Sequence, residues 1–171
     1  MAELGFIVYQ IDGLGTPWRS RAYHDFAYAD LGNGGDLKSH VEGLRQLARE
    51  HPYLDLDRVG IFGHSGGGFA SARAMLLFPD FYKVAVSSAG NHDQLGYLYV
   101  WGERYQVQVN GANYDQADNA KLAANLKGKL LLAYGDMDDN VSPSLTIRLI
   151  DALTRANKDY DLLVMPNRNH A

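Results

Sequence analysis

A short apolar run that ends in a glycine, a histidine and a serine constrains the fold of this chain more than any other stretch. Residues 59–69 read Val-Gly-Ile-Phe-Gly-His-Ser-Gly-Gly-Gly-Phe, and a segment typical of a helix follows. The G-x-S-x-G pattern places its serine on a strand-to-helix turn so tight that only small neighbours fit. We therefore expect Ser65 at the carboxyl edge of a sheet, with the Gly66 N–H placed to bind a developing oxyanion. Taken alone, the pattern is also compatible with a glycine-rich turn whose serine has no chemical role.

Two later segments supply a carboxylate and a histidine. A serine hydroxyl becomes a nucleophile when a histidine removes its proton and a carboxylate fixes the tautomer of that histidine. An Asp-rich turn, residues 135–140, follows the apolar run 129–134, and His170 follows the apolar run 161–165. Serine, acid and histidine thus each follow a strand, in the chain order that this strand-to-helix turn uses. The order favours a catalytic triad and leaves open which aspartate of the turn is the acid.

Strand and helix patterns alternate along the chain, which is typical of a mostly parallel α/β sheet with helices on both faces. Strands are expected at residues 6–11, 59–62, 84–88, 129–134 and 161–165. Asp36 is expected to cap one helix, and Ser142 another that has Pro143 in its first turn. A further helix is expected over residues 115–126. Residues 91–113 are polar and aromatic and form a candidate binding wall.

Several segments together resemble the catalytic domain of the prolyl oligopeptidase family, closest to its dipeptidyl peptidase IV branch. They are residues 11–16, the turn around Ser65, residues 135–141 and Asn169-His170. The similarity covers nearly the whole chain, and it implies an α/β-hydrolase fold and a serine peptidase. It also implies that Asp138, the first residue of an Asp-Asp-Asn triplet, is the acid and that Asn140 helps to hold substrate.

The same resemblance assigns two aromatic residues to a substrate pocket. Residues 97–105 are similar to the segment that lines the proline pocket of that branch, which gives Tyr97 and Trp101 pocket positions. Trp101 stands where the family usually has tyrosine, and Gly66 stands where it often has an aromatic residue. If the segment is helical, a spacing of four places Tyr97 and Trp101 on one helix face. The residues alone favour ordinary core aromatics at both positions, and the pocket assignment depends on the resemblance.

The chain is expected to be a single, partial α/β-hydrolase catalytic domain over residues 1–171. The resemblance implies a longer parent with earlier strands, usually an N-terminal β-propeller, and a closing C-terminal helix. One missing strand would lie between residues 6–11 and 59–62. Either these two strands then pair directly, or their edges stay unpaired and favour a homo-oligomer. The family's second oxyanion donor, a tyrosine, would precede the chain. Because one such donor contributes about 10²–10³ in kcat, the chain alone is expected to be a poor catalyst.

Composition excludes several classes of function and leaves the cellular compartment open. The 171 residues are 46% hydrophobic, which is enough for a sizeable core, and carry a formal net charge of −4. This charge gives no basic footprint for nucleic acid. The absence of cysteine excludes disulfides and thiolate chemistry. No apolar stretch approaches the roughly 20 residues of a membrane span.

Three other features suggest sites that the sequence does not support. Gly13-Leu-Gly15 lacks the third glycine and the immediate helix of a dinucleotide loop. His92-Asp93 has no second pair at ligand spacing, so a loop hydrogen bond is the better interpretation. His64 neighbours Ser65 on a tight turn where adjacent side chains point apart, and it is expected to pack or to contact substrate. We therefore expect no cofactor and no metal.

Three functions stay compatible with these residues. The leading hypothesis is a serine peptidase that cleaves peptide substrates after proline or alanine through an acyl-enzyme. An esterase or other acyl hydrolase is the second, because a triad does not itself choose between amide and ester. A non-catalytic scaffold that retains the fold is the third.

Overall fold

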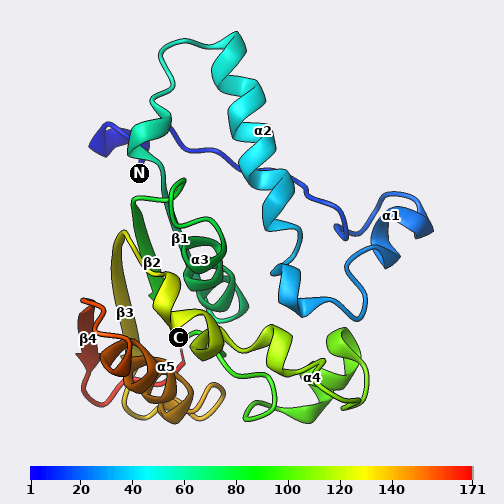
Figure 1. Ribbon diagram of the computed structural model, residues 1–171, viewed down its shortest axis with the longest axis vertical. Helices are drawn as coiled ribbons and strands as arrows, with labels where there is room; N and C mark the ends of the chain where they lie inside the picture. Colours follow the sequence, from blue (N-terminus) through cyan, green and yellow to red (C-terminus); the bar gives the residue numbers. More distant parts are fainter. Residues whose placement is uncertain (171) are drawn as a thin grey trace.

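Four parallel strands form the centre of the computed structural model, which describes residues 1–170 (Figure 1). In spatial order they are β1 (Gly60–His64), β2 (Val84–Ser88), β3 (Lys129–Gly135) and β4 (Asp161–Met165). Each neighbouring pair is parallel and in continuous register. The strands predicted near residues 59, 84, 129 and 161 are therefore confirmed. Because all four run in one direction, their carboxyl ends meet at one edge of the sheet.

Five α-helices accompany the sheet in this part of the chain, and their predicted caps are confirmed. They are α1 (Arg21–Asp25), α2 (Leu37–Glu50), α3 (Gly66–Leu77), α4 (Tyr99–Gln106) and α5 (Pro143–Arg155). Short 3-10 helices are η1 (Ala2–Leu4), η2 (Leu31–Asn33), η3 (Leu56–Arg58), η4 (Asp115–Ala117) and η5 (Asn119–Asn125). The Asp36 carboxylate accepts from the Ser39 N–H at the start of α2. The Ser142 hydroxyl accepts from the Ser144 N–H at the start of α5.

The strand predicted over residues 6–11 is wrong, because no strand lies beside it in residues 1–170. β1 is at one edge of the sheet and pairs only with β2. Residues 6–8 are each more than half exposed. Tyr9 and Ile11 instead pack so closely on α2 that a Cβ on Gly43 would lie 2.7 and 2.9 Å from them. An apolar pattern becomes a strand only where a neighbour takes up its backbone hydrogen bonds.

The helix predicted over residues 115–126 forms as the two 3-10 helices η4 and η5 rather than as one α-helix. Asp118 lies between them with extended backbone angles of −88° and 118°. Its carboxylate accepts from the Ala120 N–H at 2.8 Å and so caps a new segment. This local hydrogen bond competes with a continuous helix, as aspartate side chains commonly do.

The core lies between the sheet and helices α3 and α5, which pack beside the strands in Figure 1. Leu132 of β3 and Leu149 of α5 are fully buried there. Side chains that alternate with these along the strands project from the other face of the sheet. On that face, Phe62, Val84 and Leu163 are about half exposed, at 60%, 48% and 49%.

Leucine-to-alanine changes on the two faces of the sheet should therefore lower the free energy of unfolding by different amounts. Leu132→Ala removes a fully buried side chain and should lower the free energy of unfolding by about 2–5 kcal/mol. Leu163→Ala, the matched control on β4, should lower it by less than about 1 kcal/mol because the side chain is half exposed. Urea unfolding followed by circular dichroism measures both values. Equal losses would contradict this placement of the core.

Candidate active site

Close backbone contacts fix the conformation of Ser65 on the turn between β1 and α3. Its φ of 59° lies in the left-handed region, which costs a non-glycine residue about 1–3 kcal/mol. The Ser65 N–H donates to Ser88 O at 2.8 Å. A Cβ on Gly63 would overlap Gly67 O, and a Cβ on Gly68 would overlap Ser88 O. Packing therefore requires glycine at positions 63 and 68.

The structure brings Ser65, Asp138 and His170 together. His170 Nε2 lies 2.9 Å from Ser65 Oγ, and His170 Nδ1 lies 2.8 Å from Asp138 Oδ2. The other carboxylate oxygen, Asp138 Oδ1, accepts from the N–H groups of Asn140 and Val141 at 3.0 and 2.8 Å. The Asp138 side chain is wholly buried and the His170 side chain is 18% exposed. The arrangement has the distances and order that a proton relay from a serine to a histidine needs.

The neighbouring aspartates of the turn hold other groups. Asp136 accepts from the Asn167 N–H at 2.6 Å, and the Asp139 N–H donates to Asn169 Oδ1 at 3.1 Å. Both interactions join the turn after β3 to the turn after β4, instead of reaching His170. Asp138 is therefore the one carboxylate of the three that contacts the His170 ring in the described residues.

Sequence reasoning gave no separate role to Gly135 and Asn169, which bring Asp138 and His170 together. A Cβ on Gly135 would overlap Arg168 O, so the turns that follow β3 and β4 meet at van der Waals contact. Asn169 Oδ1 also accepts from the His170 N–H at 2.7 Å. A glycine at the start of an Asp-rich turn was the available signal, because glycine permits such a close approach of two backbones.

Tyr97 and Trp101 form an aromatic wall beside the strand-to-helix turn that carries Ser65, which we call the elbow. Their ring centroids are 5.7 Å apart in an edge-on arrangement, and Tyr105 extends the row at 5.1 Å from Trp101. Trp101 Cζ2 lies 3.6 Å from the position that a Cβ on Gly66 would take. Tyr97 precedes α4, which begins at Tyr99, so the pair does not share a helix face as expected. Trp101, the middle ring of this row of three, thus approaches the turn that carries Ser65.

Asn140 is tied to this wall. The Tyr97 hydroxyl donates to Asn140 Oδ1 at 2.6 Å. Burial, and then the nearby Asp138 charge, raise the pKa of the Tyr97 hydroxyl, which keeps it protonated as a donor. Because Oδ1 accepts this bond, the Asn140 amide group keeps its N–H donors for other partners.

His92 belongs to a buried hydrogen-bond network beneath the elbow helix. The Asn119 amide donates to His92 Nδ1 at 3.0 Å and to Phe69 O at 3.1 Å. His92 Nε2 lies 3.4 Å from Ser87 Oγ, which donates to Gly68 O at 2.7 Å. Burial lowers the pKa of His92 to about 3, so the ring is neutral and its proton belongs on Nε2. The network secures the first turn of α3, behind Ser65.

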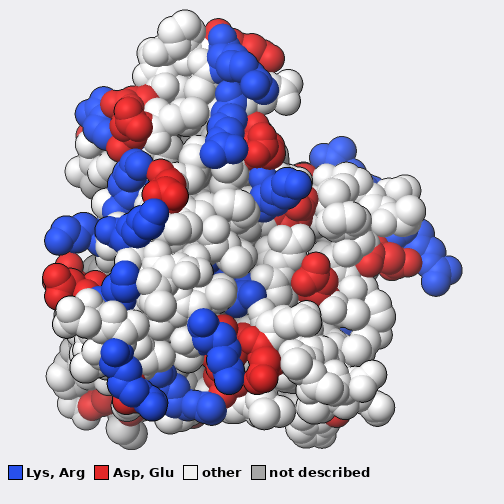
Figure 2. Space-filling view, in the orientation of Figure 1, with Lys and Arg blue, Asp and Glu red and all other residues white. Residues whose placement is uncertain are grey.

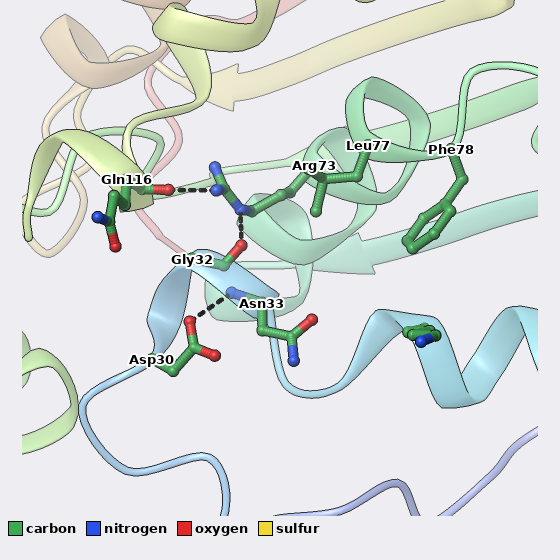
Figure 3. A pocket seen from close by; sticks show the side chains of 8 residues that line it. Asp30, Gly32, Asn33, Arg73, Leu77, Phe78 and Gln116 are labelled. Carbon is green, nitrogen blue, oxygen red and sulfur yellow. Dashed lines mark hydrogen bonds between the residues drawn. The ribbon is translucent and has the colours of Figure 1, made fainter.

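A separate hollow of about 450 Å³ lies toward the C-terminal end of α3 (Figure 3). Arg73 projects into it from α3 and donates to the carbonyl oxygens of Gly32 and Gln116, and to Asn119 Oδ1 at 3.1 Å. Burial lowers the pKa of Arg73 to about 10. The guanidinium is used by two backbone carbonyls and the Asn119 side chain, so this hollow has no free cationic centre at Arg73 to attract a ligand.

The surface carries interspersed charges. Basic and acidic side chains are interspersed over the face shown in Figure 2. Exposed ion pairs of the described residues include Lys127–Asp80 at 2.8 Å. Over residues 1–170, no helix has the length and apolar character needed to cross a membrane. The same residues hold no cluster of three or more histidine or carboxylate side chains that could bind a metal ion.

Comparison with known proteins places these features in a family. Residues 1–171 match the profile of the prolyl oligopeptidase family. Dipeptidyl peptidase 8 of Mus musculus is 33% identical over 176 residues, which cover 100% of this chain and 20% of that protein. Dipeptidyl peptidase family member 1 of Caenorhabditis elegans is 33% identical over 167 residues, which cover 96% of this chain and 20% of that protein.

A solved structure agrees with these sequence matches. The crystal structure of Porphyromonas gingivalis dipeptidyl peptidase 4 superposes with a TM-score of 0.86 at 28% identity. The superposition covers 93% of this chain and 23% of that one. The fold is therefore that of a dipeptidyl peptidase 4-like α/β-hydrolase domain, present here in part. The chain spans about a fifth of the length of the curated relatives it matches.

Acid should weaken the fold through His92. The pKa of His92 falls from 6.5 to about 3 on folding because the ring is buried. Between these values the unfolded chain binds a proton that the folded chain does not. Stability is therefore full above about pH 6.5 and falls as the pH drops toward 3, with about 2 kcal/mol lost between pH 7 and pH 5.

Urea unfolding at pH 7 and pH 5 checks this expectation. His92→Gln should remove about 2 kcal/mol of the pH-dependent loss, whereas the control His51→Gln should retain it. His51 lies at the end of α2, where its ring packs on Tyr53 rather than in the core. The same pH dependence in wild type and His92→Gln would show that His92 is not buried in its neutral form.

Proposed function

The chain belongs to the prolyl oligopeptidase family, and from this membership we propose that it is the catalytic part of a serine peptidase with Ser65 as its nucleophile. The single observation that carries the proposal is the continuous hydrogen-bonded line from Ser65 Oγ through the His170 ring to Asp138. A serine held at a left-handed φ at the N-terminus of a helix, in line with an imidazole, supports the same role.

Each proposed step follows from a contact at the site. His170 Nε2 takes the proton of Ser65 Oγ as the oxygen attacks the peptide carbonyl, and Asp138 stabilises the imidazolium that forms. The Gly66 N–H, at the first position of α3, donates to the oxyanion. His170 then gives its proton to the leaving amine. A water molecule, deprotonated by His170, hydrolyses the acyl-enzyme and releases Ser65.

The aromatic wall supports a preference for proline or alanine before the cleaved bond. Trp101, which packs on Tyr97, places apolar ring surface beside Gly66, where the residue next to the scissile carbonyl would lie. Asn140, held by the Tyr97 hydroxyl, keeps amide donors for the substrate backbone. The relatives named dipeptidyl peptidases favour a peptide substrate over an ester.

We further propose that the full-length protein carries an N-terminal β-propeller.

Removal of the nucleophile should abolish peptidase activity in the full-length protein that contains this chain. Ser65→Ala should lower kcat by roughly 10³-fold or more, because the acyl-enzyme cannot form. Ser39→Ala, in the first turn of α2, is the matched control and should retain the wild-type rate. Turnover of a proline-linked chromogenic peptide measures both. Near-normal peptidase rates in Ser65→Ala would reject Ser65 as the nucleophile, and ester turnover without peptide turnover would favour the esterase.

Trp101 should discriminate between substrates. Proline selection by ring packing is worth about 1–3 kcal/mol, so Trp101→Ala should raise KM for proline substrates more than for alanine substrates. The chain offers a matched control, because its other tryptophan, Trp18, is 99% exposed. Trp18→Ala should change neither KM. Equal effects of Trp101→Ala on both substrates would mean that Trp101 only packs against the elbow.

A further inference from the structure

A second histidine lies beside the triad. His64 is the last residue of β1, and its ring centroid is 4.8 Å from that of His170, with the ring planes tilted by 49°. His64 Nδ1 lies 3.0 Å from Ser88 Oγ. Ser88 is the register partner of His64 on β2, and such partners project from the same face of a parallel sheet. The strand pairing and one hydrogen bond thus hold the His64 ring against His170.

His170 has few other restraints. It follows β4 in a segment without regular secondary structure. Its ring makes two hydrogen bonds, one at each nitrogen, to Asp138 and Ser65. These bonds act in the plane of the imidazole, and a ring-to-ring contact adds a restraint that they do not supply.

We propose that His64 is a positioning residue for His170: its ring supports the imidazole in the orientation that takes the proton of Ser65. This inference rests on the proposed function, because it assigns His170 the role of the base. His64 is not itself the base, since its Nδ1 faces Ser88 Oγ and the nitrogen within hydrogen-bond distance of Ser65 Oγ is Nε2 of His170. The contribution comes from the aromatic ring, so phenylalanine should replace it and alanine should not.

Nuclear magnetic resonance of the chain tests the positioning directly. In the protein labelled with ¹⁵N-histidine, long-range ¹H–¹⁵N spectra report which nitrogen of each ring carries the proton. Wild-type His170 should show a single tautomer with its proton on Nδ1, toward Asp138. His64→Ala should give a mixture of tautomers or broadened His170 signals, and His64→Phe should restore the single tautomer. His51→Ala, which removes a ring that packs on Tyr53, is the control.

Reactivity supplies a second readout. The rate at which a fluorophosphonate labels Ser65 should fall about two- to tenfold in His64→Ala, the worth of one aromatic pair, and return to within about twofold in His64→Phe. In the full-length protein, kcat should fall with KM unchanged. Circular dichroism confirms that each variant is folded.

The outcomes separate the two proposals. If wild type is labelled and His64→Ala reacts at the wild-type rate with unchanged His170 signals, the positioning role is overturned and the peptidase proposal stands. If Ser65 of the full-length protein is never labelled, the peptidase proposal fails, and the His170 tautomer in His64→Ala still decides whether His64 orients that ring. Loss of both the rate and the single tautomer in His64→Phe would also overturn the role of the ring.

Discussion

Backbone packing around Ser65 is the constraint on which the rest of the site depends. Gly63 and Gly68 lie so close to Gly67 O and Ser88 O that no side chain fits at either position. This packing, with the hydrogen bond from the Ser65 N–H to Ser88 O, holds the serine at its left-handed φ. The neutral hydrogen-bond network that includes His92 secures the first turn of α3, directly after Ser65. Strain at one residue is thereby offset by contacts made by its neighbours.

A second close approach aligns Asp138 and His170. β3 and β4 are parallel neighbours, so the turns at their carboxyl ends meet, and Gly135 lets them touch. Asp136 and Asn169 then link the two turns by hydrogen bonds. Asp138 is left with one oxygen for the backbone and one for His170. Sheet topology thus brings His170 to Asp138, 32 positions earlier in the chain, and to Ser65, 105 positions earlier.

The sequence predicts four of the strands and the meeting of Ser65, an aspartate and His170, for physical reasons. The order of serine, acid and histidine after strands carries spatial meaning because parallel strands end at one edge. Residues 6–11 were misread because an apolar pattern does not reveal whether a strand lies beside it. The choice of Asp138 needed the family resemblance, because all three aspartates of the turn carry the same side chain. In the structure the Asp138 carboxylate reaches the His170 ring, whereas the Asp136 carboxylate accepts from the Asn167 N–H. The contact between His64 and His170 depends on strand register and on the end of β4, which no local pattern encodes.

The central claim is that this geometry makes the Ser65 hydroxyl the reactive nucleophile of the chain. Mass spectrometry after treatment with a fluorophosphonate tests it most directly, because the adduct can be located on a single residue. The triad predicts one adduct, on the peptide that contains Ser65, and its loss when Asp138→Asn disturbs the His170 tautomer. An adduct on a different serine, or equal modification of many serines, would contradict it.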